Sequence, residues 1–221
     1  MSTFLGNIHY WLYDKIKLHE ELIENVIDIA KKNDYNSEEL LSSSYSKYGS
    51  PVSGLLENEI DHSNIHGWLQ EKIKSVESRL AYVVTELFKS NIVKKEDVAV
   101  IFYKNAVDIV GKLGINEGTP QDIFNLIFDY MLEGMPCDRV NEIIENNRIM
   151  ITWKTTRDLH KVYWDEVGGD VNNFYYFKDS WINGFLSASG IGYKYSRTEN
   201  GINTIKKVWF YGWHCINGWG T

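Results

Sequence analysis

The sequence has little of several features that would assign a function at once. It contains three prolines and two cysteines in 221 residues, and Cys137 lies far from Cys215. No CxxC pair is present, and no Cys/His spacing is typical of structural zinc. Because proline breaks the interior of a helix, its scarcity favours long uninterrupted helices.

Concentrated positive charge is also missing. The formal net charge is −7, and no segment gathers Lys and Arg into a stripe. The one local excess, Lys94–Lys95, is followed at once by Glu96 and Asp97. Since binding to phosphates requires a positive surface, we expect no nucleic-acid partner.

Long apolar runs are absent too. The longest, AYVV and AVIFY, are far shorter than the roughly 20 residues of a membrane-spanning helix. The first residues, MSTFLGNIHYWLYDKIKLHEE, have neither the basic nor the apolar region of a signal peptide. We therefore expect a cytoplasmic protein without a membrane partner.

A repeated stretch is the clearest positive feature. Residues 7–27 and 64–84 share ten identities, including Asn-Ile-His-x-Trp-Leu-x-x-Lys-Ile-Lys, at an offset of 57. The pattern predicts an internal duplication, and apolar residues at helical spacing predict one long helix in each copy. We expect residues 1–91 to form this duplicated helical segment and residues 92–221 an α+β part, both within one compact unit.

The repeat offers two histidines at equivalent positions, His9 and His66. If the two helices lie side by side, these rings could meet and ligate a metal, as in metal sites built between facing helices. The alternative is a pair of structural first-turn histidines that bond a carbonyl or carboxylate. The Trp and Lys of each copy are expected to fill the helix interface and to cover apolar surface.

The middle of the chain favours further helices. Residues 95–113 are amphipathic and end at Gly114. Thr119-Pro120-Gln121-Asp122 is a typical helix start, which predicts a helix that runs to Gly134. Residues 135–147 (MPCDRVNEIIENN) predict a short further helix.

From residue 148 the pattern changes to that of an α+β fold. RIMITWKTT predicts a strand, residues 157–171 an irregular aromatic connection, and residues 172–190 a helix that ends at Gly190. Two more strands flank an Asn200–Gly201 turn. The fold class expected is α+β, with a helix-rich N-terminal two-thirds and a small antiparallel C-terminal sheet packed against helices.

This C-terminal part, residues 148–210, resembles the vinyl-reductase-type ligand-binding domain, whose fold is shared with haem-based nitric-oxide sensors and Golgi-transport subunits. The resemblance rests on the strand–helix–strand–strand order and on Gly184-Phe185-Leu186 in the helix. Cysteines frequent in that family are absent from the matching regions, so no cysteine-dependent activity carries over. The resemblance implies a pocket between sheet and helices for a small hydrophobic or planar ligand, and it implies no reaction.

Aromatic and polar residues in and around the connection are the candidate ligand-binding residues. Aromatic walls with a few convergent polar groups are typical of small-molecule sites. His160 and Glu166 could act as an acid–base pair or as metal ligands, or this segment could simply pack on the core. The candidates are Trp153, His160, Tyr163, Trp164, Glu166 and Trp181.

The last residues, YGWHCINGWGT, are unusually rich in Trp and also carry His214 and Cys215. We expect this tail to fold back over the pocket. Presentation to a partner, binding of a soft metal or haem, and a role as a modified peptide are the alternatives.

Three functions remain open from the sequence. The leading hypothesis is a ligand-binding or sensory protein with one pocket, whose cofactor (haem or metal) the sequence does not identify. The second is a metal-dependent hydrolase or lyase that uses His160 and Glu166, or His9 and His66. The third is an oligomerising interaction module, which would include a homodimer.

Overall fold

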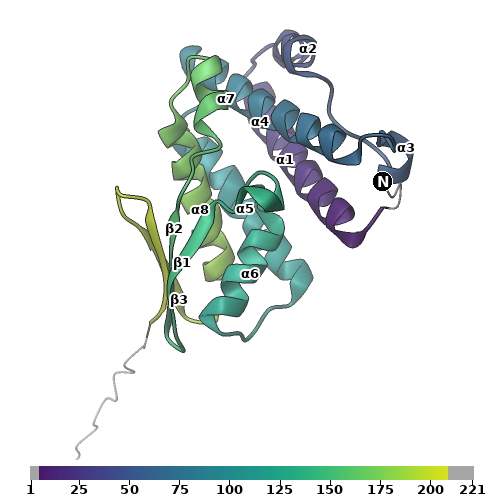
Figure 1. The fold of residues 1–221 in the computed structure, drawn as a ribbon. Coiled ribbons are helices and arrows are strands. Elements are labelled where there is room, and N and C mark those ends of the chain that lie inside the picture. The colour runs from purple at the N-terminus through teal and green to yellow at the C-terminus, as the bar shows by residue number, and fades with distance from the viewer. Residues whose placement is uncertain (1–4, 209–221) are drawn as a thin grey trace, which may run out of the picture.

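The fold is seen in a computed structural model, which describes residues 5–208 (Figure 1). Within these residues helices predominate, and the strands lie between residues 141 and 207. The α+β fold class expected from the sequence is therefore confirmed. The elements are α1 (Asn7–Lys32), α2 (Ser37–Tyr48), α3 (Leu56–Glu59), α4 (Ile65–Lys89), α5 (Lys95–Leu113), α6 (Pro120–Tyr130), the 3₁₀ turn η1 (Pro136–Asp138), β1 (Asn141–Asn146), β2 (Met150–Thr155), α7 (Lys161–Glu166), α8 (Val171–Ser189), β3 (Tyr193–Arg197) and β4 (Ile202–Lys207).

The two long helices predicted from the repeat are both present as α1 and α4. Their matching ends lie together: His9 contacts His66 near the start, and Glu20 pairs with Arg79 further along. The helices therefore run side by side in the same direction, with α2 and α3 in the connection between them (Figure 1). Both members of the Glu20–Arg79 pair are buried, so each charge requires the other.

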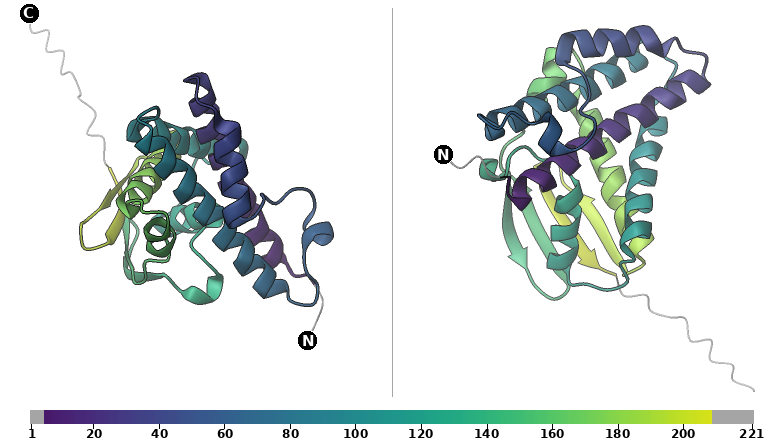
Figure 2. Two further views of the ribbon diagram at one scale, coloured as in Figure 1. Left: turned by 90° about the horizontal axis from the view of Figure 1, so that it is seen from above. Right: turned by 90° about the vertical axis from the view of Figure 1, so that its right-hand side faces the viewer.

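The sheet is antiparallel throughout, with strand order β1-β2-β4-β3. Trp153 of β2 is fully buried against Phe124 and Phe128 of α6, with ring centroids 5.0 and 5.8 Å away. Figure 2 (right) shows α6 in front of the sheet and α1 crossing above both. The aromatic contact explains why α6 covers this part of the sheet.

Two predictions for residues 119–147 were wrong. The helix that begins at Pro120 ends at Tyr130 rather than at Gly134. Residues 135–147 form the η1 turn and strand β1 instead of a helix. The β-branched pair Ile143–Ile144 suits a strand, and pairing with β2 supplies hydrogen bonds that a short isolated helix would lack.

A single hydrophobic core spans the chain from α1 to β4. It joins residues of both segments expected from the sequence, such as Ile16 and Leu80 from the first and Phe177 and Ile205 from the second. Within residues 5–208, no helix combines the length and apolar character that crossing a membrane requires. The lid predicted for the tail lies outside the described residues.

The close packing of α5 against α8 gives a direct test of the fold. A Cβ atom at Gly184 would lie 2.5 Å from the backbone oxygen of Tyr103, which cannot move without shifting α5. We expect Gly184→Ala to lower the free energy of unfolding by about 1–3 kcal/mol, as overpacking does. The measurement is urea denaturation.

Gly111→Ala is the matched control on α5, because a Cβ there meets no described atom within 4 Å. That substitution should stabilise the protein by up to about 1 kcal/mol, since alanine is the better helix former. Equal effects of the two substitutions would contradict the packing described here.

Candidate functional site

The candidate site is an open groove of about 580 Å³. One wall comes from α1 and carries Trp11 and Lys15; another comes from α6 and carries Phe124 and Phe128. The segment from Glu133 to Arg139 and the edge strand β1 complete it. The groove therefore lies between the sheet and two helices, with aromatic rings and charged groups on the same surface.

Helical spacing places Trp11, Lys15 and His19 on one stripe of α1, because residues four apart share a face. The Lys15 ammonium lies over the Trp11 ring, 3.4 Å from its centroid. The Trp11 indole N–H donates to Asp129 of α6 at 3.3 Å, which fixes the ring against the groove wall. This face of α1 therefore places the Trp11 ring and the Lys15 ammonium group side by side in the groove.

Lys15 is buried, with only 4% of its surface exposed. Burial lowers the pKa of Lys15 to about 7, and the charges of Glu133 and Asp129 oppose this shift only in part. A lysine whose charge is so poorly compensated is uncommon in a protein interior and is often found at functional sites.

Glu133 connects the groove to a buried network of charges. Its carboxylate pairs with Lys178 of α8 and lies 3.8 Å from Nε2 of His160. On its other side, Nδ1 of His160 lies 3.2 Å from Glu77 of α4. Two carboxylates and two cationic side chains therefore lie together with little exposure to solvent.

The network sets the ionisation of its members. Burial alone would lower the pKa of His160, but Glu77 and Glu133 outweigh it and raise that pKa to about 9. Burial would raise the pKa of Glu133, but Lys178 and His160 outweigh it and lower that pKa to about 2. His160 is thus a cation, and Glu133 an anion, at neutral pH.

A second hollow, of about 200 Å³, lies on the other side of this network. Glu77, His160 and Tyr163 are among its lining residues. Burial, with Glu77 next in importance, raises the pKa of Tyr163 to about 12, so its hydroxyl stays protonated. Glu133 and His160 thus form a buried bridge between the two hollows.

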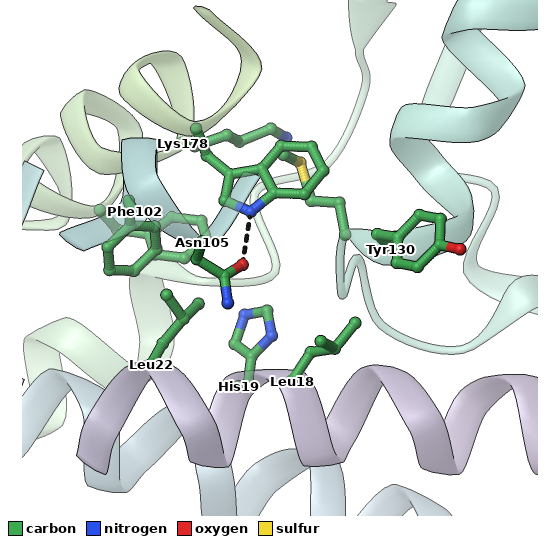
Figure 3. Close-up of a pocket in the computed structure, with 10 residues that line it drawn as sticks. Leu18, His19, Leu22, Phe102, Asn105, Tyr130 and Lys178 are labelled. Carbon is green, nitrogen blue, oxygen red and sulfur yellow. Dashed lines mark hydrogen bonds between the residues drawn. The ribbon is translucent and has the colours of Figure 1, made fainter. Parts of the chain in front are cut away.

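A third pocket is small and apolar, and Figure 3 shows it between α1, α5 and α8. His19 points from α1 towards Asn105, whose Oδ1 accepts the indole N–H of Trp181 at 2.9 Å. Burial lowers the pKa of His19, and the charge of Glu77 and the backbone of Lys15 oppose this shift. The space of about 20 Å³ is large enough for one water molecule and too small for an organic ligand.

The residues predicted for one ligand site are distributed over several places. His160 and Tyr163 line the second hollow, and Trp181 lines the third pocket. Trp153 and Trp164 are fully buried in the core. Glu166 is exposed and lines a separate hollow beside Lys47. The carboxylates that face His160 are those of Glu77 and Glu133.

His9 and His66 do meet, with their Nε2 atoms 3.3 Å apart on the surface. The Gly6 N–H donates to Nδ1 of His9, which leaves the neutral ring's proton on Nε2, facing His66. To ligate a metal through Nε2, the neutral ring of His9 would have to carry its proton on Nδ1 instead. Nδ1 could then no longer accept the Gly6 N–H at the start of α1. Among residues 5–208, no group of three His, Cys, Asp or Glu side chains could hold a metal ion.

Several residues of the groove and the network were not predicted from the sequence as site residues. Lys15 stood in the repeat but was expected only to cover apolar surface. Glu77, Glu133 and Lys178 carry no local motif, and only the tertiary fold brings them together. Comparison with protein-family models, with curated proteins and with solved structures finds no match for this chain.

The network predicts how His160 contributes to stability. Its folded pKa lies above its ordinary value of 6.5, so the contribution is fully present below pH 6.5 and is lost as the pH rises through about 9. We expect His160→Gln to cost about 3–5 kcal/mol at pH 6, because the buried Glu77 loses its cationic partner and Glu133 keeps only Lys178. The cost should be smaller at pH 9.5.

Denaturant unfolding at both pH values measures this difference. His62→Gln is the control, because His62 is exposed and hydrogen-bonds a backbone oxygen outside the buried network. A His160→Gln cost that is the same at pH 6 and pH 9.5 would rule out the charged state assigned to His160.

Proposed function

We propose that the protein binds a small planar, largely hydrophobic molecule in the groove between α1, α6 and β1. The proposal rests on the groove's volume together with its aromatic lining. The volume of about 580 Å³ falls within the range of roughly 300–1,000 Å³ that is usual for small-molecule sites. Aromatic rings from two helices line it, and such rings stack on planar ligands.

The groove is also held in shape by contacts that do not need the ligand. Phe124 and Phe128 pack on each other and on Trp153, and Asp129 accepts the N–H of Trp11. Side chains fixed in this way lose little conformational freedom when a ligand enters, which favours affinity. This supports binding as the function rather than a groove left by loose packing.

Catalysis has weaker support. His160 lies between two carboxylates with its pKa raised to about 9, so it would act as an acid rather than a base. Glu166, the partner expected from the sequence, is exposed and in a different hollow. Ligand binding therefore explains more of the structure than a hydrolase or lyase mechanism does.

Fluorescence titration with N-phenyl-1-naphthylamine, a neutral planar dye, tests this proposal. Trp11→Leu should weaken dye binding about tenfold, because losing an aromatic wall costs roughly 1.4 kcal/mol. Trp68→Leu is the matched control: Trp68 occupies the equivalent position of the repeat and packs near Tyr13, away from the groove. No saturable binding, or equal weakening by both substitutions, would refute the proposal.

A further inference from the structure

We propose that the molecule bound in the groove carries an oxyanion, a carboxylate or a phosphate, which Lys15 and Arg139 hold. This inference rests on the proposed function, since it names the chemical class of the ligand for the same groove. Both side chains line the groove, one from α1 and the other from the segment before β1.

Lys15 is the first line of argument. Its side chain is 4% exposed, and its one described partner is the face of the Trp11 ring. No carboxylate of residues 5–208 lies within ion-pair distance of its ammonium group. A buried cation in this position is costly unless an anion or a hydrogen-bond acceptor joins it.

The carboxylates of the groove are occupied elsewhere. Glu133 is bound to Lys178 and faces His160. Asp129 accepts the indole N–H of Trp11. Neither carboxylate forms an ion pair with Lys15, although the charges of both raise its pKa and so oppose the effect of burial in part.

Arg139 supplies a second cation at the groove. The residue is exposed and has a left-handed backbone (φ 49°), directly after the η1 turn. In the described part of the chain its guanidinium forms no ion pair. A guanidinium can bind a carboxylate or phosphate with two parallel hydrogen bonds, which suits an anion entering from solvent.

The repeat provides an internal comparison for Lys15. Lys72 occupies the equivalent position of α4 and lies 5.4 Å from the centroid of Trp68. Its side chain is 23% exposed and pairs with Glu71 at 3.5 Å. Lys72 therefore has access to solvent and a carboxylate partner. Lys15, at the matching position of the repeat, lines the groove and has no carboxylate partner.

Binding of the oxyanion should depend on pH. The charged groups that act on Lys15 are Glu133, in the segment after α6, and Asp129 of α6. Arg139 lines the same groove, and His19 lies one turn further along α1. Because the pKa of Lys15 is lowered to about 7, an anion must draw a proton onto the amine above that pH. Affinity should then fall by up to about tenfold per pH unit above 7.

Two dyes with the same skeleton test the inference. 1-Anilinonaphthalene-8-sulfonate differs from N-phenyl-1-naphthylamine by one sulfonate, an oxyanion. In the wild type at pH 7, the sulfonate should bind at least about tenfold more tightly. Lys15→Met should abolish the preference for the sulfonate over the neutral dye, and Arg139→Gln should reduce it in part.

Lys72→Met is the matched control and should leave both dyes unchanged. If both dyes bind equally and Lys15→Met has no effect, the inference fails while a Trp11-dependent groove stands. If Trp11→Leu weakens the binding of neither dye, both the proposed function and this inference fail. The pH dependence of the wild type is a second measurement that needs no variant: a sulfonate affinity that stays flat from pH 6.5 to 9 also overturns the inference.

Discussion

The ion pair between Glu133 and Lys178 is the contact on which the rest of the site depends. It ties the segment after α6 to the middle of α8, and His160 extends it to Glu77 on α4. Because all four side chains are buried, removing one leaves a charge without compensation in a low-dielectric interior. The network therefore fixes α4, α8 and the floor of the groove relative to one another.

That arrangement explains the electrostatics of the groove. Glu133 is part of the groove, yet its charge is used by Lys178 and His160. Lys15 is left in a buried position with an aromatic ring as its nearest partner. A groove whose Glu133 is already paired and whose Lys15 has no ion-pair partner is suited to an acidic ligand, because the bound anion would supply the missing partner.

Local patterns in the sequence identified most of the fold. Repeated apolar spacing marked α1 and α4, Thr119–Pro120 marked the start of α6, and Gly190 ended α8 as expected. Strand β1 was missed because NEIIEN fits a short helix as well as a strand until β2 pairs with it. The site was harder still: His160 was found, but its partner Glu77 lies 83 residues away, and no spacing in the sequence reports such a contact.

The most direct test of the account is the ionisation of Lys15, followed by NMR of the lysine side-chain carbons and nitrogens through a pH titration. One lysine, absent from the spectrum of Lys15→Met, should titrate near pH 7. Saturation with 1-anilinonaphthalene-8-sulfonate should raise its pKa, because the bound oxyanion stabilises the ammonium form. If every lysine instead titrates near the ordinary value of 10.5, with or without the dye, the groove holds no uncompensated cation and the account is contradicted.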